Sequence, residues 1–460
     1  MASVHGTRLG FAFLLLAASA GEAAGGGLFL APRAVRPLAR GGAYVAGADD
    51  VNALSYNPAG IGEAPNSALF DMGLPIHSTT FTRSGGLPSV EGQGFGIPSP
   101  SVGVVHDLGL IEGLRFGLGV FFDYPMLQNW PSNLEDGSPA PQRYAIENFK
   151  GSGFGKLALG AAYSLGEMVT VGASFHLLSG RFVAQMAVSA CDGVICTQPE
   201  NTDYDATMRM TIGSFFIPGA QLGLIVKPVS ILRVGLAWES AYNFNEAAEL
   251  SMRMPTAPMF ADASVFPEVP TAMVKMTIPM QLRGGVELRP DPFLRVEVAF
   301  DWEKWSDHAR IDLEPEGVGM DDVLMLGRYQ LQAMSIDRSF HDTWSVRLGA
   351  EYAPPLGQRP LTVRAGVAYE PSAVPDETLT AMTVDLDKLI VGVGAGYALG
   401  SYQIELMYAY VWMRPRTIGD SQSLQMNPTR PAWDRRTAVG NGDYRSTAHI
   451  VGAGASYRFR

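Results

Sequence analysis

Residues 277–289 read TIPMQLRGGVELR, and residues 294–303 read LRVEVAFDWE. In both stretches apolar residues recur at every second position, from Ile278 to Leu288 and from Leu294 to Trp302. Successive side chains of a β-strand point to opposite faces, so a period of two predicts strands with one apolar face and one polar or small face. The first stretch is also longer than an ordinary strand of a globular protein.

The same alternation recurs at 346–352 and 361–370, and the whole chain contains about fourteen candidate strands. We expect them near residues 66–82, 98–108, 113–123, 153–165, 167–187, 203–228, 231–254, 270–289, 293–308, 341–353, 361–371, 387–399, 401–413 and 447–459. Tight turns alternate with long connections along this series. Short turns at one end and long loops at the other are typical of outer-membrane barrels.

An apolar face on every strand must either pack against a second sheet or face lipid. A soluble sandwich favours charged outer faces and a dry interior, whereas here one face of each strand is apolar and the other carries Arg and Glu. Closing the sheet in lipid satisfies every strand edge. The sequence therefore predicts an all-β fold, a transmembrane antiparallel β-barrel of about fourteen strands.

Composition agrees with an exported membrane protein. Of the 460 residues 47% are hydrophobic and only 17% are charged, against about a quarter charged in soluble proteins. The net charge is -11, and no basic cluster offers a surface for phosphate backbones. This argues against nucleic-acid binding.

The N-terminus has the order of features of a secretory signal peptide. Arg8 precedes an apolar run from Leu9 to Ala20 that ends in small residues suited to cleavage near Ala20. We therefore expect residues 1–20 to be a signal peptide, with a buried N-terminal helix as the alternative. Beyond it no apolar stretch approaches the length of a transmembrane helix. The prediction is an exported protein of the bacterial outer membrane.

Residues 21–65 are rich in Gly and Ala and show no sustained period. We expect them to form a hatch, or plug, inside the lumen of a barrel made by residues 66–460. A disordered periplasmic tail is the alternative.

The two cysteines are Cys191 and Cys196. In an exported chain this spacing favours a small disulfide loop over a metal pair, because two further ligands are missing nearby. We expect no metal site.

Several motifs resemble those of the FadL family of outer-membrane transporters for long-chain fatty acids and aromatic hydrocarbons. Residues 42–50 read GAYVAGADD and are followed by Asn57-Pro58-Ala59, which resembles the family's hatch motif. Similar blocks follow in the family's order at 301–306, 342–349 and 364–370. The resemblance implies a monomeric barrel of fourteen strands with an N-terminal hatch. It also implies passive transport, in which an apolar ligand is caught by extracellular loops and leaves sideways at a kinked third strand.

In the third strand Arg115, Gly117 and Gly119 are expected to face the lumen. Glycines interrupt strand pairing, so we take this stretch as the candidate lateral opening. The alternative is that the glycines only make room in the lumen.

Two predicted extracellular loops are unusually apolar. Clustered apolar side chains on a surface usually mark a binding site, and methionine adapts to ligands of varied shape. The candidate ligand-binding residues in these loops are Met126, Leu127, Trp130, Met259, Phe260 and Phe266. Alternatively, the loops pack on each other and close the barrel mouth.

Inward-facing arginines are further candidates. Arg295 and Arg347 could hold a fatty-acid carboxylate through charge-assisted hydrogen bonds. Glutamates share the same face, so a ladder of ion pairs across strands is the favoured alternative.

We find no motif of an enzyme or of a cofactor site. The predicted function is passive transport of hydrophobic small molecules, such as long-chain fatty acids or hydrocarbons, across the outer membrane. The expected partners are such a ligand, or a detergent in its place, and outer-membrane lipid. Two alternatives are a transport-inactive barrel that assists assembly of exported proteins and a porin for polar solutes.

Overall fold

The computed structural model describes residues 29–30, 34–94, 98–122, 124–125, 127–191, 193–194, 196–323, 327–355, 360–428 and 436–459. The expected signal peptide, Met126 and residues 21–28 and 31–33 of the expected hatch lie outside these residues. In the described part of the chain no helix is both long and apolar enough to cross a membrane.

The fold is a closed antiparallel barrel of 14 strands, as predicted. Each strand pairs with its neighbours along the chain, and the last pairs with the first over its whole length. In order, the wall consists of β2 (Ser67–Arg83), β4 (Ser99–His106), β5 (Leu114–Phe122), β8 (Gly153–Leu165), β9 (Val169–Ser189), β10 (Asp205–Val229), β11 (Leu232–Glu239) continued by β12 (Tyr242–Arg253), β14 (Thr271–Ile278) continued by β15 (Gln281–Asp291), β16 (Leu294–Glu303), β21 (Thr343–Tyr352), β22 (Leu361–Glu370), β23 (Lys388–Leu399), β24 (Tyr402–Met413) and β26 (Gly442–Arg458).

Two strands that we expected to be continuous are divided. The strand predicted at 231–254 is interrupted between Glu239 and Tyr242. The strand predicted at 270–289 is interrupted between Ile278 and Gln281, where Pro279 has no N–H to donate to the ladder. In each case the second piece still pairs within the barrel wall.

The long connections contain short strands that extend the wall. β17 (Arg310–Pro315) pairs with β14 and with β20 (Met334–Asp337). The other short strands are β1 (Phe29–Leu30), β3 (Ser89–Gly94), β6 (Tyr124–Pro125), β7 (Gln128–Asn129), β13 (Ser264–Phe266), β18 (Gly319–Val323), β19 (Gly327–Gln330) and β25 (Arg416–Ile418).

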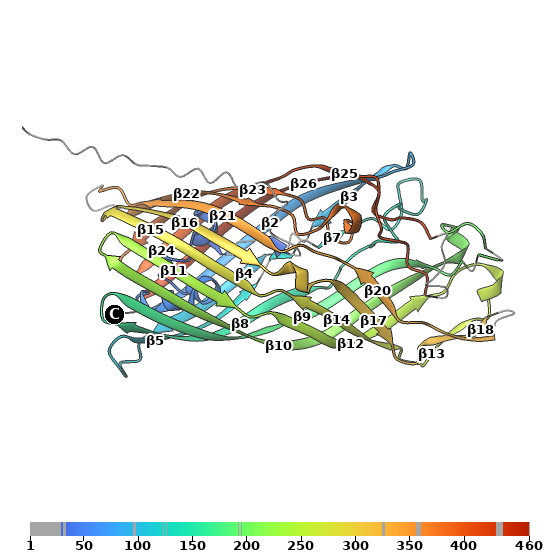
Figure 1. Cartoon of the computed structure of the whole chain (residues 1–460), viewed down its shortest axis with the longest axis horizontal. Helices are drawn as coiled ribbons and strands as arrows, with labels where there is room; N and C mark the ends of the chain where they lie inside the picture. Colours follow the sequence, from blue (N-terminus) through green and yellow to red (C-terminus); the bar gives the residue numbers. More distant parts are fainter. Residues whose placement is uncertain are drawn as a thin grey trace, which may run out of the picture.

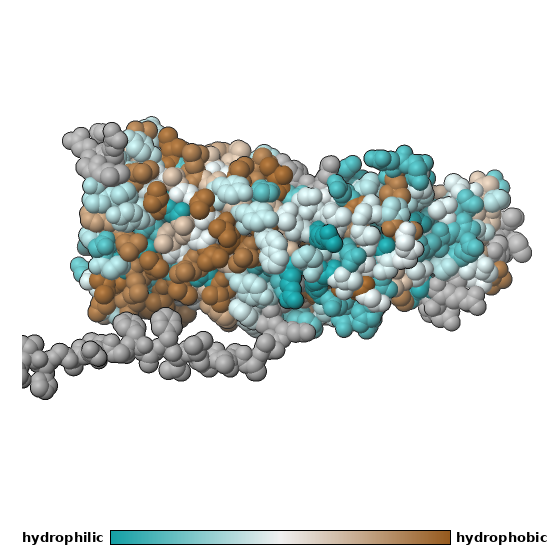
Figure 2. All heavy atoms as spheres, turned by 90° about the horizontal axis from the view of Figure 1, so that it is seen from above, coloured by the Kyte–Doolittle hydropathy of each residue, from teal (hydrophilic) through white to brown (hydrophobic). Residues whose placement is uncertain are grey.

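Tight turns and the C-terminus lie at one end of the barrel, and the long loops lie at the other (Figure 1). Apolar side chains cover the half near the tight turns, whereas the half near the long loops is mainly polar outside (Figure 2). Exposed apolar residues of this belt include Phe70, Ile76, Leu118, Leu159, Phe175, Leu222, Val298, Val391 and Leu406. The barrel thus extends beyond its apolar belt on the long-loop side.

Residues 34–65, called the plug here, lie inside the barrel. They form α1 (Val35–Ala39), α2 (Ala53–Tyr56) and the 3-10 turn η1 (Pro58–Gly62), and nearly all of them are buried. α1 packs on β22, β23 and β24, while η1 packs on β8, β9 and β10. The remaining 3-10 turns are η2 (Thr202–Tyr204), η3 (Pro258–Phe260), η4 (Trp305–Asp307) and η5 (Asp376–Thr378).

Candidate functional site

The plug fits into the wall because wall glycines let its backbone approach closely. A Cβ on Gly366 of β22 would overlap the backbone of Arg40 and Gly41. A Cβ on Gly172 of β9 would likewise overlap the backbone of Pro58. Any larger residue at these positions would therefore push the plug away from the wall.

Asn57-Pro58-Ala59 fastens the plug to the opposite side of the lumen. The Asn57 side chain is fully buried; it donates to the carbonyl oxygens of Val45 at 2.9 Å and Leu224 at 3.2 Å. Its Oδ1 accepts from the N–H of Ala59 at 3.1 Å, which caps η1. One side chain therefore connects two parts of the plug to β10 of the wall.

A buried ion-pair cluster holds the first half of the plug. Arg40 is inaccessible to solvent and donates to Glu287 at 2.9 Å and Glu297 at 3.1 Å. Glu297 also accepts from the three successive backbone amides of residues 45–47 at 2.6–3.0 Å. Successive amides of this kind form an anion-binding concavity. A wall carboxylate is thus enclosed by plug donors.

Arg295, a predicted ligand residue, belongs to the same cluster. Its guanidinium contacts Asp49 at 2.8 Å, the Gly47 carbonyl at 2.7 Å and Glu287 at 3.1 Å. Burial alone would raise the pKa of Asp49, but the guanidinium groups of Arg295 and Arg36 outweigh it and hold that pKa well below its usual value. Arg295 therefore pairs across strands with Glu287 and also connects the wall to the plug through Asp49.

Arg347, the second predicted arginine, has the same kind of environment. It pairs with Asp301 at 2.7 Å and Glu370 at 2.6 Å, and it approaches the Gly41 carbonyl at 3.4 Å. Both guanidinium groups are paired with carboxylates, and Arg295 also lines a cavity at the tight-turn side of the plug.

The space at the tight-turn side of the plug is strongly polar. A cavity of about 280 Å³ there is lined by charged groups of both the plug and the wall. Its charged lining residues are Arg36, Asp49, Asp50, Glu63, Asp71, Arg295, Glu351, Arg364, Glu405 and Arg458.

Directly on the other side of the plug lies a polar layer. Lys156 pairs with Glu239 at 2.9 Å, and Tyr242 donates to the same carboxylate at 2.9 Å. Arg283 bridges Glu239 at 3.1 Å and the carbonyl of Ser55 in the plug at 3.0 Å. This layer separates the plug from the part of the lumen nearer the long loops.

Beyond this layer, up to the long loops, most buried side chains are apolar, with a few buried polar pairs such as His77 and Gln128 among them. Loops 127–149 and 371–386 fold into this space and complete one continuous apolar cluster. Its wall residues include Leu178, Met208, Ile212, Phe215, Ile217, Phe244, Leu250, Val274 and Leu313. We call this part of the barrel the apolar chamber.

The strand pairing at Gly117 and Gly119 does not support the expected opening in the third strand. Gly117 and Gly119 are paired on both sides, with β4 and with β8. Gly117 leaves room for Leu54 of the plug, and Arg115 donates to the Ala64 carbonyl. Gly117 and Arg115 thus contact the plug, whereas Gly119 lies beside the Phe121 ring.

The wall ladder instead stops after Phe122. β5 ends there, and the next residues of the chain form β6, which pairs with β1 of the N-terminal segment rather than with its wall neighbours. The register between β5 and β8 ends at Phe122 and Gly155, so Phe154 and Gly153 of β8 have no partner in the third strand. Further along the chain, β7 pairs with β3 within the barrel sheet.

The apolar loop residues are mostly packed against other loops. Leu127 is 6% exposed and Trp130 is 3% exposed, and the Trp130 indole donates to the Ala381 carbonyl at 3.0 Å. Met259 and Phe260 are also buried. Half-buried Phe266 lies under the guanidinium of Arg328.

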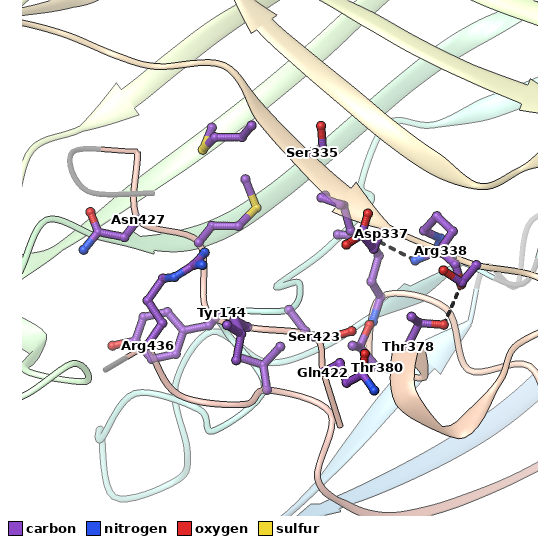
Figure 3. A pocket seen from close by; sticks show the side chains of 18 of the residues that line it. Tyr144, Ser335, Asp337, Arg338, Thr378, Thr380, Gln422, Ser423, Asn427 and Arg436 are labelled. Atoms are coloured by element: carbon purple, nitrogen blue, oxygen red, sulfur yellow. Dashed lines mark hydrogen bonds between the residues drawn. The ribbon is translucent and has the colours of Figure 1, made fainter. Parts of the chain in front are cut away.

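Several loops converge at the mouth around a cavity of about 360 Å³ (Figure 3). Tyr144, Asn427 and Arg436 lie on one side of it, and Arg338 and Thr378 lie on the other. Its apolar lining includes Ile336, Leu424, Val439 and the three methionines Met334, Met382 and Met426. The sequence did not single out these residues, because no local pattern indicates which loops meet.

Cys191 and Cys196 form a disulfide beside this mouth. The Cys191 carbonyl accepts from Asn427 at 2.7 Å, which connects the disulfide loop to a second loop of the cavity. Among the residues that the structure describes, no group of three or more His, Cys, Asp or Glu could hold a metal ion.

Comparison with known proteins gives matches over nearly the whole chain. Residues 16–459 match the family described as outer membrane protein transport protein (OMPP1/FadL/TodX). A FadL homologue from Pseudomonas aeruginosa has a similar structure, with a TM-score of 0.74 and 16% identity, covering 94% of this chain and 100% of that one. No curated protein matches.

Two toluene transporters have the same fold. For TodX from P. putida the TM-score is 0.65 at 16% identity, covering 93% of this chain and 99% of that one. For TbuX from Ralstonia pickettii it is 0.60 at 17% identity, covering 92% and 97%. The protein is an outer-membrane β-barrel, and it belongs to the outer membrane protein transport protein (OMPP1/FadL/TodX) family.

Proposed function

We propose that this barrel takes up hydrophobic small molecules passively. In this proposal a ligand enters the mouth cavity from outside, crosses the apolar chamber and leaves sideways into the membrane through the wall after Phe122. Long-chain fatty acids and aromatic hydrocarbons are the substrate classes, and a single chain suffices because the barrel closes on itself.

The change of lining along the lumen carries this proposal. On the long-loop side of the plug the interior contains one large apolar cluster, whereas the plug region and the space on its tight-turn side are lined by charged groups. Transfer of apolar surface between such environments changes the free energy by about 25 cal/mol per Å². A hydrophobic ligand is therefore favoured in the chamber and disfavoured on a straight path through the plug.

The end of β5 supports the sideways exit. The third strand stops at Phe122, whereas its neighbour β8 extends two residues further, to Phe154 and Gly153. Inward-facing Phe154 lies beside this end and packs with Phe182 and Phe215. The apolar lining thus extends to the interrupted part of the wall.

The experiment is uptake of labelled long-chain fatty acid, toluene and a small sugar by cells that lack their own transporters. We expect entry of at least one hydrophobic compound and exclusion of the sugar. Asn57→Ala removes the hydrogen bonds to Val45, Leu224 and Ala59, each worth about 1 kcal/mol. We expect it to alter hydrophobic uptake, and exposed Asn245→Ala on the outside of β12 is the matched control.

A second variant tests the exit. Pro100→Cys with Gly153→Cys places two outward-facing thiols on either side of the end of the third strand, and a bis-maleimide linker closes that part of the wall. Uptake should fall after cross-linking. The control joins Val367→Cys to Val391→Cys, which face each other across an unbroken ladder. Undiminished uptake in the cross-linked protein would exclude this exit.

Other outcomes distinguish the remaining functions. Entry of the sugar would identify a porin for polar solutes. Failure of a correctly inserted barrel to admit any hydrophobic compound, together with co-purification of an exported protein, would identify an assembly partner.

A further inference from the structure

Four cations gather on the outside of the wall, on the long-loop side of the apolar belt. Arg181 of β9, Arg209 of β10 and Arg253 of β12 come from three neighbouring strands of the ladder. Lys150 belongs to the loop before β8, and its carbonyl accepts from Arg209 at 3.4 Å. We call these four residues the outer basic patch.

The strand register shows that the patch faces away from the lumen. Met208 of β10 is buried in the apolar chamber, so its neighbours Thr207 and Arg209 point outward. Arg253 lies opposite Thr207 in the ladder and is exposed, as is Arg181. A partner of the patch therefore lies outside the barrel and not in the lumen.

The patch is not neutralised by carboxylates. Among the residues that the structure describes, none of its four cations has a carboxylate oxygen within ion-pair distance, and outward-facing Glu249 of β12 is no exception. Arg253 donates to the Thr207 hydroxyl at 2.8 Å, which is a neutral acceptor. By contrast, exposed Lys275 on the adjacent β14 pairs with Glu314 at 2.6 Å. In a chain with a net charge of -11, the patch is a local excess of positive charge.

A polar cavity of about 510 Å³ lies beside the patch, between the strands β9, β10 and β12 and the loop before β8. Arg209 and Arg253 line it, together with hydroxyl and amide groups such as those of Ser132, Ser251 and Gln185. Such groups supply both donors and acceptors, which is what the hydroxyl groups of a sugar require.

The carboxylates that line this cavity are already engaged. Asp205 accepts from Arg143 at 3.0 Å and from Tyr144 at 2.7 Å. Glu147 accepts from Gln185 at 2.7 Å. The two patch arginines at the cavity therefore remain for an anionic ligand.

The patch begins where the apolar belt ends. Phe216 of β10 is 62% exposed and is paired with Ser179 of β9. Arg181 is the next outward residue of β9 beyond this pair, and Arg209 is paired with Gln185, four residues further along. At about 3.3 Å per residue, the patch spans roughly 13 Å along β9 from the edge of the belt. Lipid headgroups occupy this position, because they lie directly outside the hydrocarbon layer.

The chemistry of the patch suits one kind of headgroup. Clusters of basic residues beside an apolar span attract anionic headgroups. Planar guanidinium groups match phosphate oxygens and form strong charge-assisted hydrogen bonds with them. A headgroup that contains sugars would also use the hydroxyl-lined cavity. Lipopolysaccharide, the glycolipid of the outer leaflet of bacterial outer membranes, has a headgroup of phosphorylated sugars.

We propose that the outer basic patch binds the phosphorylated sugar headgroup of lipopolysaccharide in the surrounding outer leaflet. Phosphate groups contact Arg181, Arg209 and Arg253, and a sugar occupies the adjoining cavity. This is a lipid contact on the outside of the wall, and it does not depend on what the lumen transports.

The test measures binding of fluorescent lipopolysaccharide to the purified full chain in a nonionic detergent. Arg209→Gln with Arg253→Gln removes two patch charges. The matched control, Lys275→Gln with Arg310→Gln, removes two exposed charges that are paired with carboxylates. Only the patch variant loses charge-assisted hydrogen bonds to phosphate, so we expect roughly tenfold weaker binding there and a change within about twofold in the control.

Two further probes define what is recognised: lipopolysaccharide stripped of its phosphates, and phosphatidylglycerol, which has a phosphate but no sugar. We expect both to bind native protein more weakly than intact lipopolysaccharide. Undiminished binding of intact lipopolysaccharide by the patch variant, in protein that shows the heat-modifiable mobility of a folded barrel, would overturn the proposal. Undiminished binding of the stripped lipid would exclude the phosphate contact, and equal binding of phosphatidylglycerol would exclude the sugar contact.

Discussion

The two halves of the lumen are built on one continuous wall but are held together differently. Around the plug, contacts are directional: Arg40 lies between two glutamates, and Glu297 accepts three backbone amides. In the apolar chamber, side chains such as Phe215 and Phe244 meet only through apolar contact, at a centroid distance of 5.1 Å. Directional contacts define one position for the plug, whereas apolar contacts permit many packings of similar energy.

The largest effect on plug position should come from filling the space that Gly366 leaves for the plug backbone. Gly366→Leu places a side chain where the backbone of Arg40 and Gly41 lies, and backbone cannot move aside without leaving the wall. We expect the barrel to form with the plug displaced, which would appear as steady ion conductance in planar bilayers. Lipid-facing Gly284→Leu is the control, because a Cβ there meets nothing closer than 3.7 Å. Equal conductance for both variants would mean that close approach does not hold the plug.

Glu297→Ala should have the next largest effect. It leaves Arg40 with one of its two carboxylates and three plug amides without an acceptor. Breaking a buried ion pair on one side typically costs about 3–5 kcal/mol. We expect a lower unfolding temperature and protease cleavage within residues 34–65. Exposed Glu314→Ala, whose partner Lys275 lies on the surface, should change neither.

In the apolar chamber a conservative change should matter far less. Phe215→Leu keeps an apolar side chain and loses the aromatic contacts with Phe244 and Phe154, about 0.5–1.5 kcal/mol each. We expect hydrophobic uptake to remain within about twofold of the native rate. A loss as large as that of Glu297→Ala would show that the chamber is as specifically packed as the plug region.

Mild acid should have the smallest effect. The pKa of Asp49 is lowered in the folded chain by Arg295 and Arg36, which outweigh burial. A lowered pKa stabilises the folded state above the unfolded value of about 3.9 and loses this contribution only as the pH falls through the folded value. Bilayer conductance should therefore stay low from pH 7 to pH 5. A rise within that window would indicate that another group controls the plug.

The sequence predicted the wall better than the lumen. The alternation of apolar and polar residues revealed the strands. It did not reveal the interruption at Ser240 and Ala241, because no change in the sequence pattern marks that position. The same alternation also predicted that Arg295 and Arg347 face the lumen. It could not predict their partners, because Asp49 and Gly41 belong to the plug, far away in sequence.

The sequence by itself determined the barrel, since a period of two and the alternation of turns and loops follow directly from strand geometry and from the need to pair every edge in lipid. Only the tertiary structure decided which polar groups meet, where the third strand ends and how the loops close the mouth. Arg338 illustrates the reason: its neighbours Met382 and Thr383 lie in another loop, so these contacts arise only when the chain has folded.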